Sequence, residues 1–588
     1  MTIIKKNLDQ LISKAYDSYK KKDLLNAEDY CRQALKINPE HYDSISLLAT
    51  IFAISKNFVK AKELMILALK IDPKNISSLN NLGTAHKQLG ELDEALKIYK
   101  EVLKVEPNHI NANYNIGLVY YDLRALKKSK AHLKKATEIK KDYANAFFSL
   151  GNVHSDLKEY KQALSCYQKS IEINPNMIAA HNNTGLVYRE LNDFKNAINS
   201  YEMAIKIKPN HVNAHHNLAL SLKELGNFEK SIKSHEMAIK YEPENLMNYH
   251  FLGELKKEIL DKDLKKKINA ILNSSNLTLR NAAYGNYLLS KYEKKEKNYQ
   301  KEIEHLIRGH QNFYNMSKNK FDLGVKYCFD DVLQIIEGGK VFKSLKKSKF
   351  NINPIFILGV PRSGSTLVER IISSGKNFIP LGEETGVIGN FIPMKVTEKQ
   401  SLNLGNSSNL ADELFKIYEA RNLVFKEYDF TFTDKSLDNF FYMKFISDIF
   451  PSAKIIHCKR DPLSSIMSIF QNNLTALAWT HNLENIFKYF DNCFKIIKTY
   501  KDSKPNNIYE IKFENLINSP VEESKKLMNF CNLPWDKKCL EFYKRKDLFS
   551  KTASNIQIRK AIYKHPQEKY LPYKEILKKY GANYSWFN

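Results

Sequence analysis

A glycine-bearing loop at residues 359–366 has the spacing of a phosphate-binding motif. It reads G-V-P-R-S-G-S-T, which is the Walker A pattern G-x-x-x-x-G-K-[ST] with Ser365 in the place of the lysine. Backbone N–H groups at the start of the helix that follows such a loop can bind a phosphate. The lysine that reaches the β and γ phosphates of a nucleoside triphosphate is absent. The loop therefore predicts an anion site and argues against ATP or GTP hydrolysis and against a P-loop kinase.

Further polar motifs follow in a region where short β-rich runs alternate with helical ones, a pattern that predicts a parallel α/β sheet. The segment LGEETGVIGN places Glu383 and Glu384 in an otherwise uncharged, glycine-rich stretch. The strand-like AKIIHC ends in K-R-D-P at residues 459–462, and Ser468 follows eight residues after Arg460. The alternative interpretation of the two glutamates is a pair of surface charges.

Taken together, these motifs resemble the sulfotransferases. The loop P-R-S-G-S-T-L at 361–367 is similar to the phosphosulfate-binding loop of that family. The resemblance covers about residues 355–575, and it is nearest to bacterial sulfotransferases that contain tetratricopeptide repeats and to the tyrosylprotein sulfotransferases. It implies transfer of a sulfuryl group from 3'-phosphoadenosine 5'-phosphosulfate (PAPS) to a hydroxyl acceptor, with no metal ion required because fixed cations and backbone donors supply the electrostatics.

The resemblance also implies a role for each matching residue. Glu384 corresponds to the family's catalytic base, which takes the proton of the acceptor hydroxyl, and Glu383 is expected to matter less. Lys435, which follows the strand-like FTFTD, and Ser554, in TASNIQIRKAIYKHP, would stabilise charge on the leaving oxygen. The residues expected to bind the cofactor are Arg362, Ser363, Gly364, Ser365, Thr366, Arg460, Ser468 and Lys560.

Within that set, the loop and Arg362 would hold the 5'-phosphosulfate, and Arg460 with Ser468 would hold the 3'-phosphate. The basic pair Arg559 and Lys560 leaves two alternatives, because either side chain could reach a phosphate. His457 lies in the middle of a strand and is expected to be a packed or hydrogen-bonded core residue.

The sequence departs from the family pattern at two places. Phe513 occupies the tyrosine position of the strand-loop motif Y-E-x-L-x-x-x-P, where Glu514 is expected to order the loop. Two arginines that the tyrosylprotein sulfotransferases place after the catalytic glutamate correspond to Gly386 and Asn390. Since neither residue can pair with a carboxylate, acidic tyrosine peptides are expected to be poor substrates unless the solenoid supplies the missing contacts.

The first half of the chain contains a 34-residue repeat with a proline and several small residues at fixed positions. Each unit is expected to form two amphipathic helices that cross closely at the small residues, with the proline ending the second helix. Phrases such as NLGTAHKQLGELDEALKIYKEVLKVEP resemble the tetratricopeptide repeat (TPR), in about seven copies. We call the equivalent positions of successive repeats a ladder, and the prolines on it are Pro39, Pro73, Pro107, Pro175, Pro209 and Pro243.

The predicted architecture is an all-α TPR solenoid at 1–245, a helical linker at 246–350 and a P-loop-like α/β sulfotransferase domain with a parallel sheet at 351–588. Stacked repeats leave a groove that suits a protein or peptide partner, although a scaffold without its own ligand is the alternative. The acceptor could be a protein, a glycan or a small molecule. The alternative from another class is a TPR adaptor whose C-terminal domain binds a nucleotide without turning it over.

Composition limits the partners and the compartment. Lys and Arg exceed Asp and Glu by 91 − 65 = 26 charges, but the excess is mostly lysine spread along the chain. We therefore expect no nucleic acid partner, and interpret the lysine-rich runs of 246–350 as solvated helix faces. The 7 cysteines form no C-x-x-C pair, and no stretch is apolar enough for a membrane span. A soluble, cytoplasmic protein is expected.

Overall fold

The computed structural model describes residues 2–337, 352–376, 379–401, 410–421, 423–545, 549–563 and 567–587. The chain divides into two compact units, residues 1–214 and 215–588. The predicted boundary between residues 350 and 351 lies outside the described residues. The predicted end of the repeats at 245 stays a prediction.

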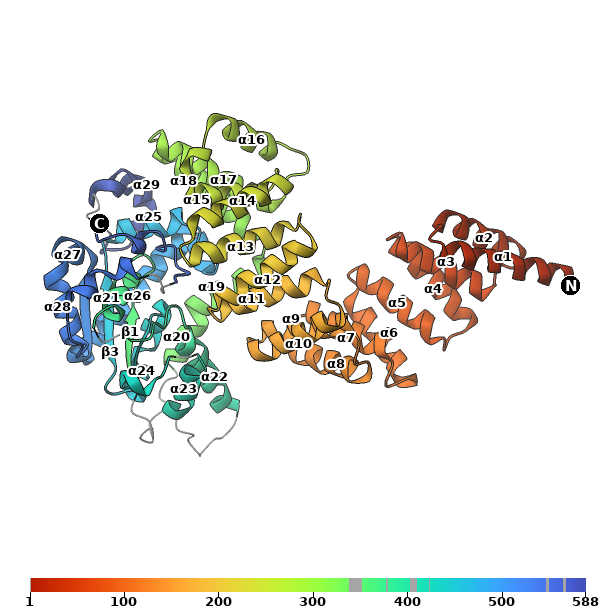
Figure 1. The fold of residues 1–588 in the computed structure, drawn as a ribbon, viewed down its shortest axis with the longest axis horizontal. Helices are drawn as coiled ribbons and strands as arrows, with labels where there is room; N and C mark the ends of the chain where they lie inside the picture. The colour runs from red at the N-terminus through yellow and green to blue at the C-terminus, as the bar shows by residue number, and fades with distance from the viewer. Residues whose placement is uncertain are drawn as a thin grey trace. The chain divides into compact units, whose positions relative to one another are not determined.

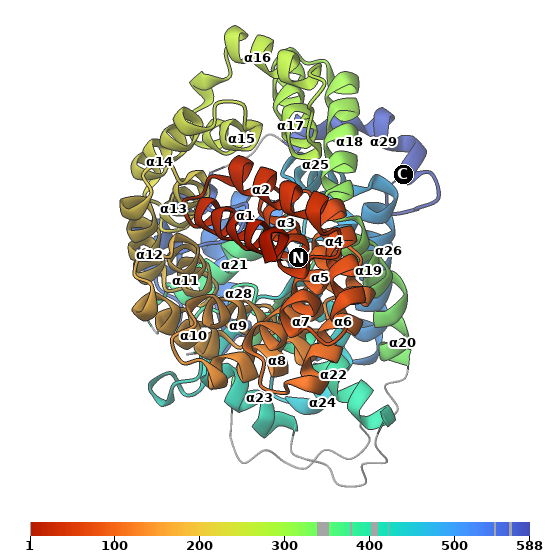
Figure 2. The ribbon, with the colours of Figure 1, turned by 90° about the vertical axis from the view of Figure 1, so that its right-hand side faces the viewer.

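Unit 1 is a solenoid of helix pairs that follow one another along the chain (Figure 1 and Figure 2). The second helix of a pair ends two residues before the ladder proline, as α2 at Ile37 before Pro39. The helices are α1 (Thr2–Lys20), α2 (Leu24–Ile37), α3 (Tyr42–Ile54), α4 (Phe58–Ile71), α5 (Ile76–Gln88), α6 (Leu92–Val105), α7 (Ile110–Asp122), α8 (Leu126–Ile139), α9 (Ala144–Asp156), α10 (Tyr160–Ile173), α11 (Ile178–Glu190) and α12 (Phe194–Ile207).

Small residues on the ladder make room for large ones within each pair. A Cβ atom added to Gly83 would lie 2.6 Å from the ring of Tyr99, and one added to Gly151 would lie 2.6 Å from the ring of Tyr167. Both tyrosines are buried, so the ring on the second helix packs directly against the backbone of the first. This close approach explains the predicted small positions.

The turn inside each helix pair contains one residue in the left-handed region. At this position φ ranges from 58° to 82°. Five of the seven turns accept a side chain there, which shows that the backbone conformation does not by itself require glycine. The seven residues are Lys22, Lys56, Gly90, Arg124, Lys158, Asn192 and Gly226.

Unit 2 begins within the first helix of the seventh pair and continues with helices that share a hydrophobic core with the sheet. The segment expected to be a linker contributes Leu246, Tyr287 and Leu306 to this core, together with Phe356 of the first strand. These helices are α13 (Val212–Glu224), α14 (Phe228–Tyr241), α15 (Leu246–Leu255), α16 (Lys262–Leu272), α17 (Leu279–Lys295), α18 (Tyr299–Asn315), α19 (Lys318–Lys326) and α20 (Val332–Glu337).

The sheet of unit 2 has four parallel strands in the order β2-β1-β3-β4, as the sequence pattern predicted. The strands are β1 (Asn353–Leu358), β2 (Thr431–Asp434), β3 (Lys454–Lys459) and β4 (Ile508–Lys512). Helices cover both faces of the sheet (Figure 1). Each face has its own hydrophobic core, since Phe356 and Leu358 pack into one core cluster and Ile355 and Ile357 into the other.

The remaining helices of unit 2 surround this sheet. They are α21 (Ser365–Ser373), α22 (Val387–Ser401), α23 (Leu410–Glu419), α24 (Met443–Ile449), α25 (Pro462–Gln471), α26 (Leu483–Ser503), α27 (Phe513–Asn518), α28 (Pro520–Phe530) and α29 (Lys574–Gly581). Within the described ranges, no helix combines the length and the apolar character needed to cross a membrane. The cysteines are all free thiols, and burial raises the pKa of Cys31 to about 12.

Candidate functional site

The predicted site residues meet where the parallel strands end. The glycine-bearing loop follows β1, Lys435 follows β2, Arg460 follows β3 and Phe513 follows β4. Ligands of open parallel sheets bind outside the carboxyl ends of the strands, where neighbouring connections diverge. Motifs that are far apart in the sequence therefore contribute to one edge of the sheet.

The loop between β1 and α21 has the geometry of an anion cradle. Gly364 caps α21 with φ of 95°, and a Cβ atom there would lie 2.5 Å from the ring of Phe513. The hydroxyl of Ser363 is buried and has no hydrogen-bond partner among the described residues. Because an unpaired buried hydroxyl is costly, a ligand oxygen at this loop would supply the partner that the described residues do not. Ser365 and Thr366, also predicted, are buried in the first turn of α21.

Arg362 joins three parts of the site through its guanidinium group. Its Nε donates to Oγ of Ser468 (2.9 Å), and its Nη1 donates to Oγ of Ser554 (2.6 Å). Its Nη2 donates to Oε1 of Gln557 (3.2 Å), a residue that sequence reasoning did not single out. Burial, helped by the nearby Arg460 cation, lowers the pKa of Arg362 to about 10, so the group remains a cation at neutral pH.

Arg460 is held in place from two sides. Its Nη1 donates to the carbonyl oxygen of Arg362 (3.0 Å), and its guanidinium lies 4.8 Å from the ring centroid of Phe513. The N–H of Asp461 donates to Oε1 of Glu514 (3.0 Å), so Glu514 holds the loop after β3, while the expectation that it orders its own loop after β4 stays a prediction. His457 is buried and lies 3.3 Å from Oε1 of Glu510, which confirms it as a core residue.

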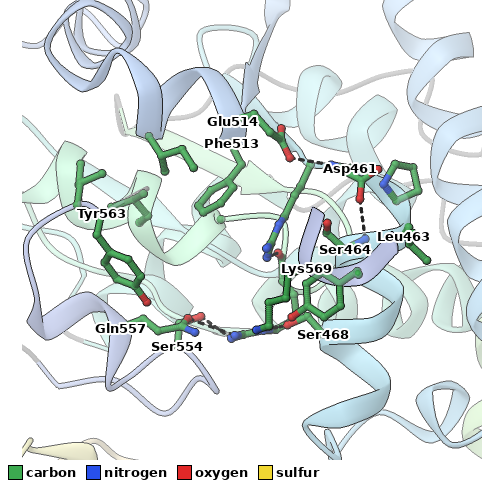
Figure 3. Close-up of a pocket in the computed structure, with 18 of the residues that line it drawn as sticks. Asp461, Leu463, Ser464, Ser468, Phe513, Glu514, Ser554, Gln557, Tyr563 and Lys569 are labelled. Atoms are coloured by element: carbon green, nitrogen blue, oxygen red, sulfur yellow. Dashed lines mark hydrogen bonds between the residues drawn. The ribbon is translucent and has the colours of Figure 1, made fainter. Parts of the chain in front are cut away.

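A cavity of about 430 Å³ opens beside these cations. Figure 3 shows Ser468, Ser554 and Gln557 along one side of it and Phe513 and Glu514 along the other. The predicted cofactor residues that line it are Arg362, Gly364, Arg460, Ser468 and Lys560, together with Ser554. It is also lined by Tyr563, Lys569, Tyr570 and Lys574, which lie in a Lys- and Tyr-rich C-terminal segment that carries no distinguishing motif.

The basic pair Arg559 and Lys560 separates in the structure. Lys560 lines the cavity. Arg559 instead donates from Nε to Oδ1 of Asn555 (3.0 Å) and from Nη2 to the carbonyl oxygen of Glu224 (2.9 Å). Of the two side chains, that of Lys560 lines this cavity, and its contact with a phosphate stays a prediction.

Lys435 lies in a second cluster, with the two glutamates. Its Nζ is 3.0 Å from Oε1 of Glu384 and 3.6 Å from Oε1 of Glu383. The main chain fixes this arrangement, because the N–H of Lys435 donates to the carbonyl of Gly382 (2.9 Å) and the N–H of Glu384 donates to the carbonyl of Lys435 (3.0 Å). Burial acts to lower the pKa of Lys435, but Glu384, Glu383 and Glu369 outweigh it and raise that pKa.

The two glutamates differ in exposure. The side chain of Glu383 is 2% exposed, lies 3.5 Å from the guanidinium of Arg370 and accepts a hydrogen bond from Oγ of Ser550 (2.9 Å). The side chain of Glu384 is 44% exposed. Partial burial raises the pKa of Glu384, against the lowering effect of the Lys435 ammonium. Glu384 thus reaches solvent, while Glu383 is an internal counter-ion.

The two clusters are connected by the segment that carries Ser554. Ser550, which donates to Glu383, shares a hydrogen bond with Oγ1 of Thr552 (2.9 Å). That Oγ1 atom lies 3.5 Å from Oγ1 of Thr366 in α21. Among the described residues, Lys435 and Ser554 share no hydrogen bond or ion pair: Lys435 contacts carboxylates, and Ser554 accepts from Arg362. In the part of the chain that the structure describes, no group of three or more His, Cys, Asp or Glu side chains could hold a metal ion.

Family comparisons agree with both halves of the sequence interpretation. Residues 354–537 match the model of the sulfotransferase family. Models of the tetratricopeptide repeat match residues 85–123, 110–143, 144–177, 185–226 and 212–245. The chain thus combines TPR repeats with a C-terminal sulfotransferase domain.

Several known proteins are similar to parts of the chain. An uncharacterized protein of Aquifex aeolicus (strain VF5) is 29% identical over 328 residues, which are 53% of this chain and 42% of that protein. Protein-tyrosine sulfotransferase 1 of Danio rerio is 25% identical over 199 residues, 31% of this chain and 54% of that protein. The protein in the crystal structure of MamA is 28% identical in sequence, with a TM-score of 0.27. The match covers 28% of this chain and 95% of the MamA chain. The chain spans about half the length of these curated relatives.

Proposed function

We propose that this protein is a PAPS-dependent sulfotransferase that acts on a hydroxyl acceptor. The observation that carries the proposal is the Arg362 guanidinium, which bonds Ser468 and Ser554 beside Arg460 at the end of a parallel sheet. These four residues come from three separate motifs that resemble cofactor-binding segments of sulfotransferases. The sulfotransferase domain and its similarity to tyrosine sulfotransferases support the same reaction class.

The residues present fit PAPS. The unpaired hydroxyl of Ser363 and the left-handed Gly364 suit a phosphate oxygen close to the loop backbone. Arg460 and Lys560 line the cavity with positive charge, as a 3'-phosphate requires, and Arg460 presents a planar fork for two hydrogen bonds. PAPS, when bound, would supply a sulfuryl group attached to a phosphate that can leave with its negative charge.

Glu384 is the proposed general base. Its exposed carboxylate can accept the proton of an acceptor hydroxyl, which makes the oxygen a better nucleophile as it attacks. The Lys435 ammonium, 3.0 Å away, favours the ionised carboxylate that this role needs. Glu383 balances the charge of Lys435 from within the protein, so the cation is fixed before any ligand arrives.

Arg362, Ser554 and Lys435 are the proposed stabilisers of the leaving group. Arg362 and Ser554 hold each other by a hydrogen bond of 2.6 Å, which fixes both donors toward one cavity. Their cation and hydroxyl can bind the charge that develops on a phosphate oxygen during transfer. Lys435 adds a positive charge from the neighbouring strand end.

The departures around the base and the repeats support a proposal for the acceptor class. Asn390 donates its amide to the carbonyl of Gly386 (2.5 Å), so neither of these two positions presents a cation to an acidic peptide. We propose a polypeptide or its attached glycan as the acceptor, with the TPR groove as a docking surface that raises its effective concentration. A small free hydroxyl compound is the other possibility.

Incubation of the full chain with radiolabelled PAPS and a pool of proteins and glycans tests the proposal. We expect label transfer by the wild-type chain and almost none by Glu384→Gln. A matched titration with PAP and ATP should show tight binding of PAP alone. Binding of PAP without label transfer would favour the nucleotide-binding adaptor, and no preference for PAP over ATP would reject the assignment.

A further inference from the structure

One carbonyl oxygen at the end of the seventh repeat's first helix accepts hydrogen bonds from three donors of the C-terminal segment. It belongs to Glu224, the last residue of α13, and its partners are the N–H of Ser550 (3.1 Å), Nδ2 of Asn555 (3.1 Å) and Nη2 of Arg559 (2.9 Å). The last carbonyls of a helix have no partner inside it, and the negative end of the helix dipole attracts a cation. The helix end is therefore a binding site for this segment, and both lie in unit 2.

The segment held in this way carries site residues at both ends. Ser550 donates its hydroxyl to Glu383, the counter-ion of Lys435. Four residues further on, Ser554 accepts from Arg362 and lines the cavity. Asn555, between Ser554 and Arg559, is buried and also donates to the carbonyl of Ser550 (2.5 Å), so the segment is folded back on itself against the helix end.

Gly226 provides a second sign of this contact. Its turn position has a left-handed residue in every repeat, and Lys, Arg or Asn occupies it in five of seven. A Cβ atom at Gly226 would lie 2.5 Å from Nε of Arg559, whereas one at Gly90, with a similar φ, would have no described atom within 4 Å. A side chain at 226 would therefore have to displace the Arg559 guanidinium, a conflict that the same turn position in the repeat of Gly90 does not present.

We propose that the seventh repeat is a positioning element of the sulfotransfer site, in which Gly226 and Arg559 are positioning residues. The Arg559 guanidinium sits in the space left by Gly226, bonds the Glu224 carbonyl, and so fixes Ser554 for Arg362 and the cofactor. This inference rests on the proposed function, because Ser554 is assigned to the PAPS site. It assigns to the last repeat a task at the catalytic centre, separate from docking an acceptor.

A matched pair of substitutions in the full chain tests this. Asn192 shows that asparagine is accepted at the turn position, so Gly226→Asn and Gly90→Asn make the same change in two repeats. We expect Gly226→Asn to weaken PAP binding in calorimetry, and to raise KM for PAPS, by about tenfold, the scale of one or two hydrogen bonds. Gly90→Asn should leave both within about twofold of wild type.

A double-mutant cycle separates positioning from a general loss of stability. Arg559→Ala alone should weaken PAP binding, and adding Gly226→Asn to it should change the affinity by less than about twofold, because the side chain that the asparagine strikes is gone. Additive effects, or equal effects of Gly226→Asn and Gly90→Asn, would overturn the inference while leaving the proposed function intact. If the wild-type chain binds no PAP, both fall.

Discussion

Glu384 and Lys435 are joined twice, once by their side chains and once by their backbones. Oε1 of Glu384 lies 3.0 Å from Nζ of Lys435, and the N–H of Glu384 donates to the carbonyl of Lys435 (3.0 Å). The segment that carries the glutamate runs parallel to the end of β2, through the bridge between Glu383 and Lys435. The distance between the proposed base and its cation is therefore set by backbone pairing, which two flexible side chains alone could not fix.

Glu384→Gln should keep the PAP affinity of the wild type and lower turnover by roughly 100-fold, because the amide cannot take a proton from the acceptor. Single-turnover sulfation and PAP titration measure the two quantities. The matched control is Glu383→Gln, which should reduce the free energy of unfolding by about 3–5 kcal/mol by breaking a buried ion pair. A larger kinetic than stability effect at Glu383 would reverse the two roles.

Arg460→Ala should weaken PAP binding by about 2–4 kcal/mol, since a charge-assisted contact to the 3'-phosphate is lost. ATP lacks that phosphate, so its much weaker binding should hardly change. The shift in unfolding temperature with each nucleotide measures this. An equal loss for PAP and ATP would contradict a 3'-phosphate site at Arg460.

Glu369 should make stability depend on pH. Burial raises its pKa to about 7, whereas the unfolded chain titrates near 4.3. The folded chain therefore binds more protons between these values, and the stabilisation is complete below the unfolded pKa and is lost as the pH rises through 7. Urea unfolding measures the free energy of unfolding at pH 5 and at pH 8. We expect this free energy to fall more between the two pH values for the wild type than for Glu369→Gln. Equal falls would show that Glu369 is ionised in the folded protein.

Two truncations should differ sharply in cofactor binding. Removal of residues 1–207 keeps α13 and Glu224, whereas removal of 1–245 deletes the acceptor of three hydrogen bonds to the Ser554 segment. PAP calorimetry should give near wild-type affinity for the first and a loss of at least about tenfold for the second. If both bind PAP equally, the segment does not need the helix end.

Acidic tyrosine peptides should be poor acceptors for the wild-type chain. Asn390→Arg places a cation where an acidic residue beside the target tyrosine could pair with it, and it should raise kcat/KM for such a peptide by about twofold to fivefold, the scale of one exposed ion pair. A neutral peptide of the same length is the control and should show no gain. Efficient sulfation of the acidic peptide by the wild type would refute the argument from Gly386 and Asn390.

Local sequence patterns were enough to predict the helical solenoid, the parallel α/β domain and the residues that follow each strand. The 34-residue ladder, the strand-loop-helix around Gly364 and the K-R-D-P motif at 459–462 each lie within a few dozen residues, where spacing alone dictates helices, strands and turns. Arg362, Arg460 and Ser468 could be singled out because each belongs to such a motif, and parallel strands then bring their ends to one edge.

Only the tertiary structure showed how neighbouring side chains of the same type differ in burial and in contacts. Glu383 and Glu384 are adjacent and chemically identical, but backbone pairing with Lys435 buries one and exposes the other. Arg559 and Lys560 differ for the same kind of reason, since Arg559 bonds a carbonyl 335 residues away in the last repeat. Sequence spacing carries no information on such contacts, because they form only when separately determined elements pack together and bury their polar groups in pairs.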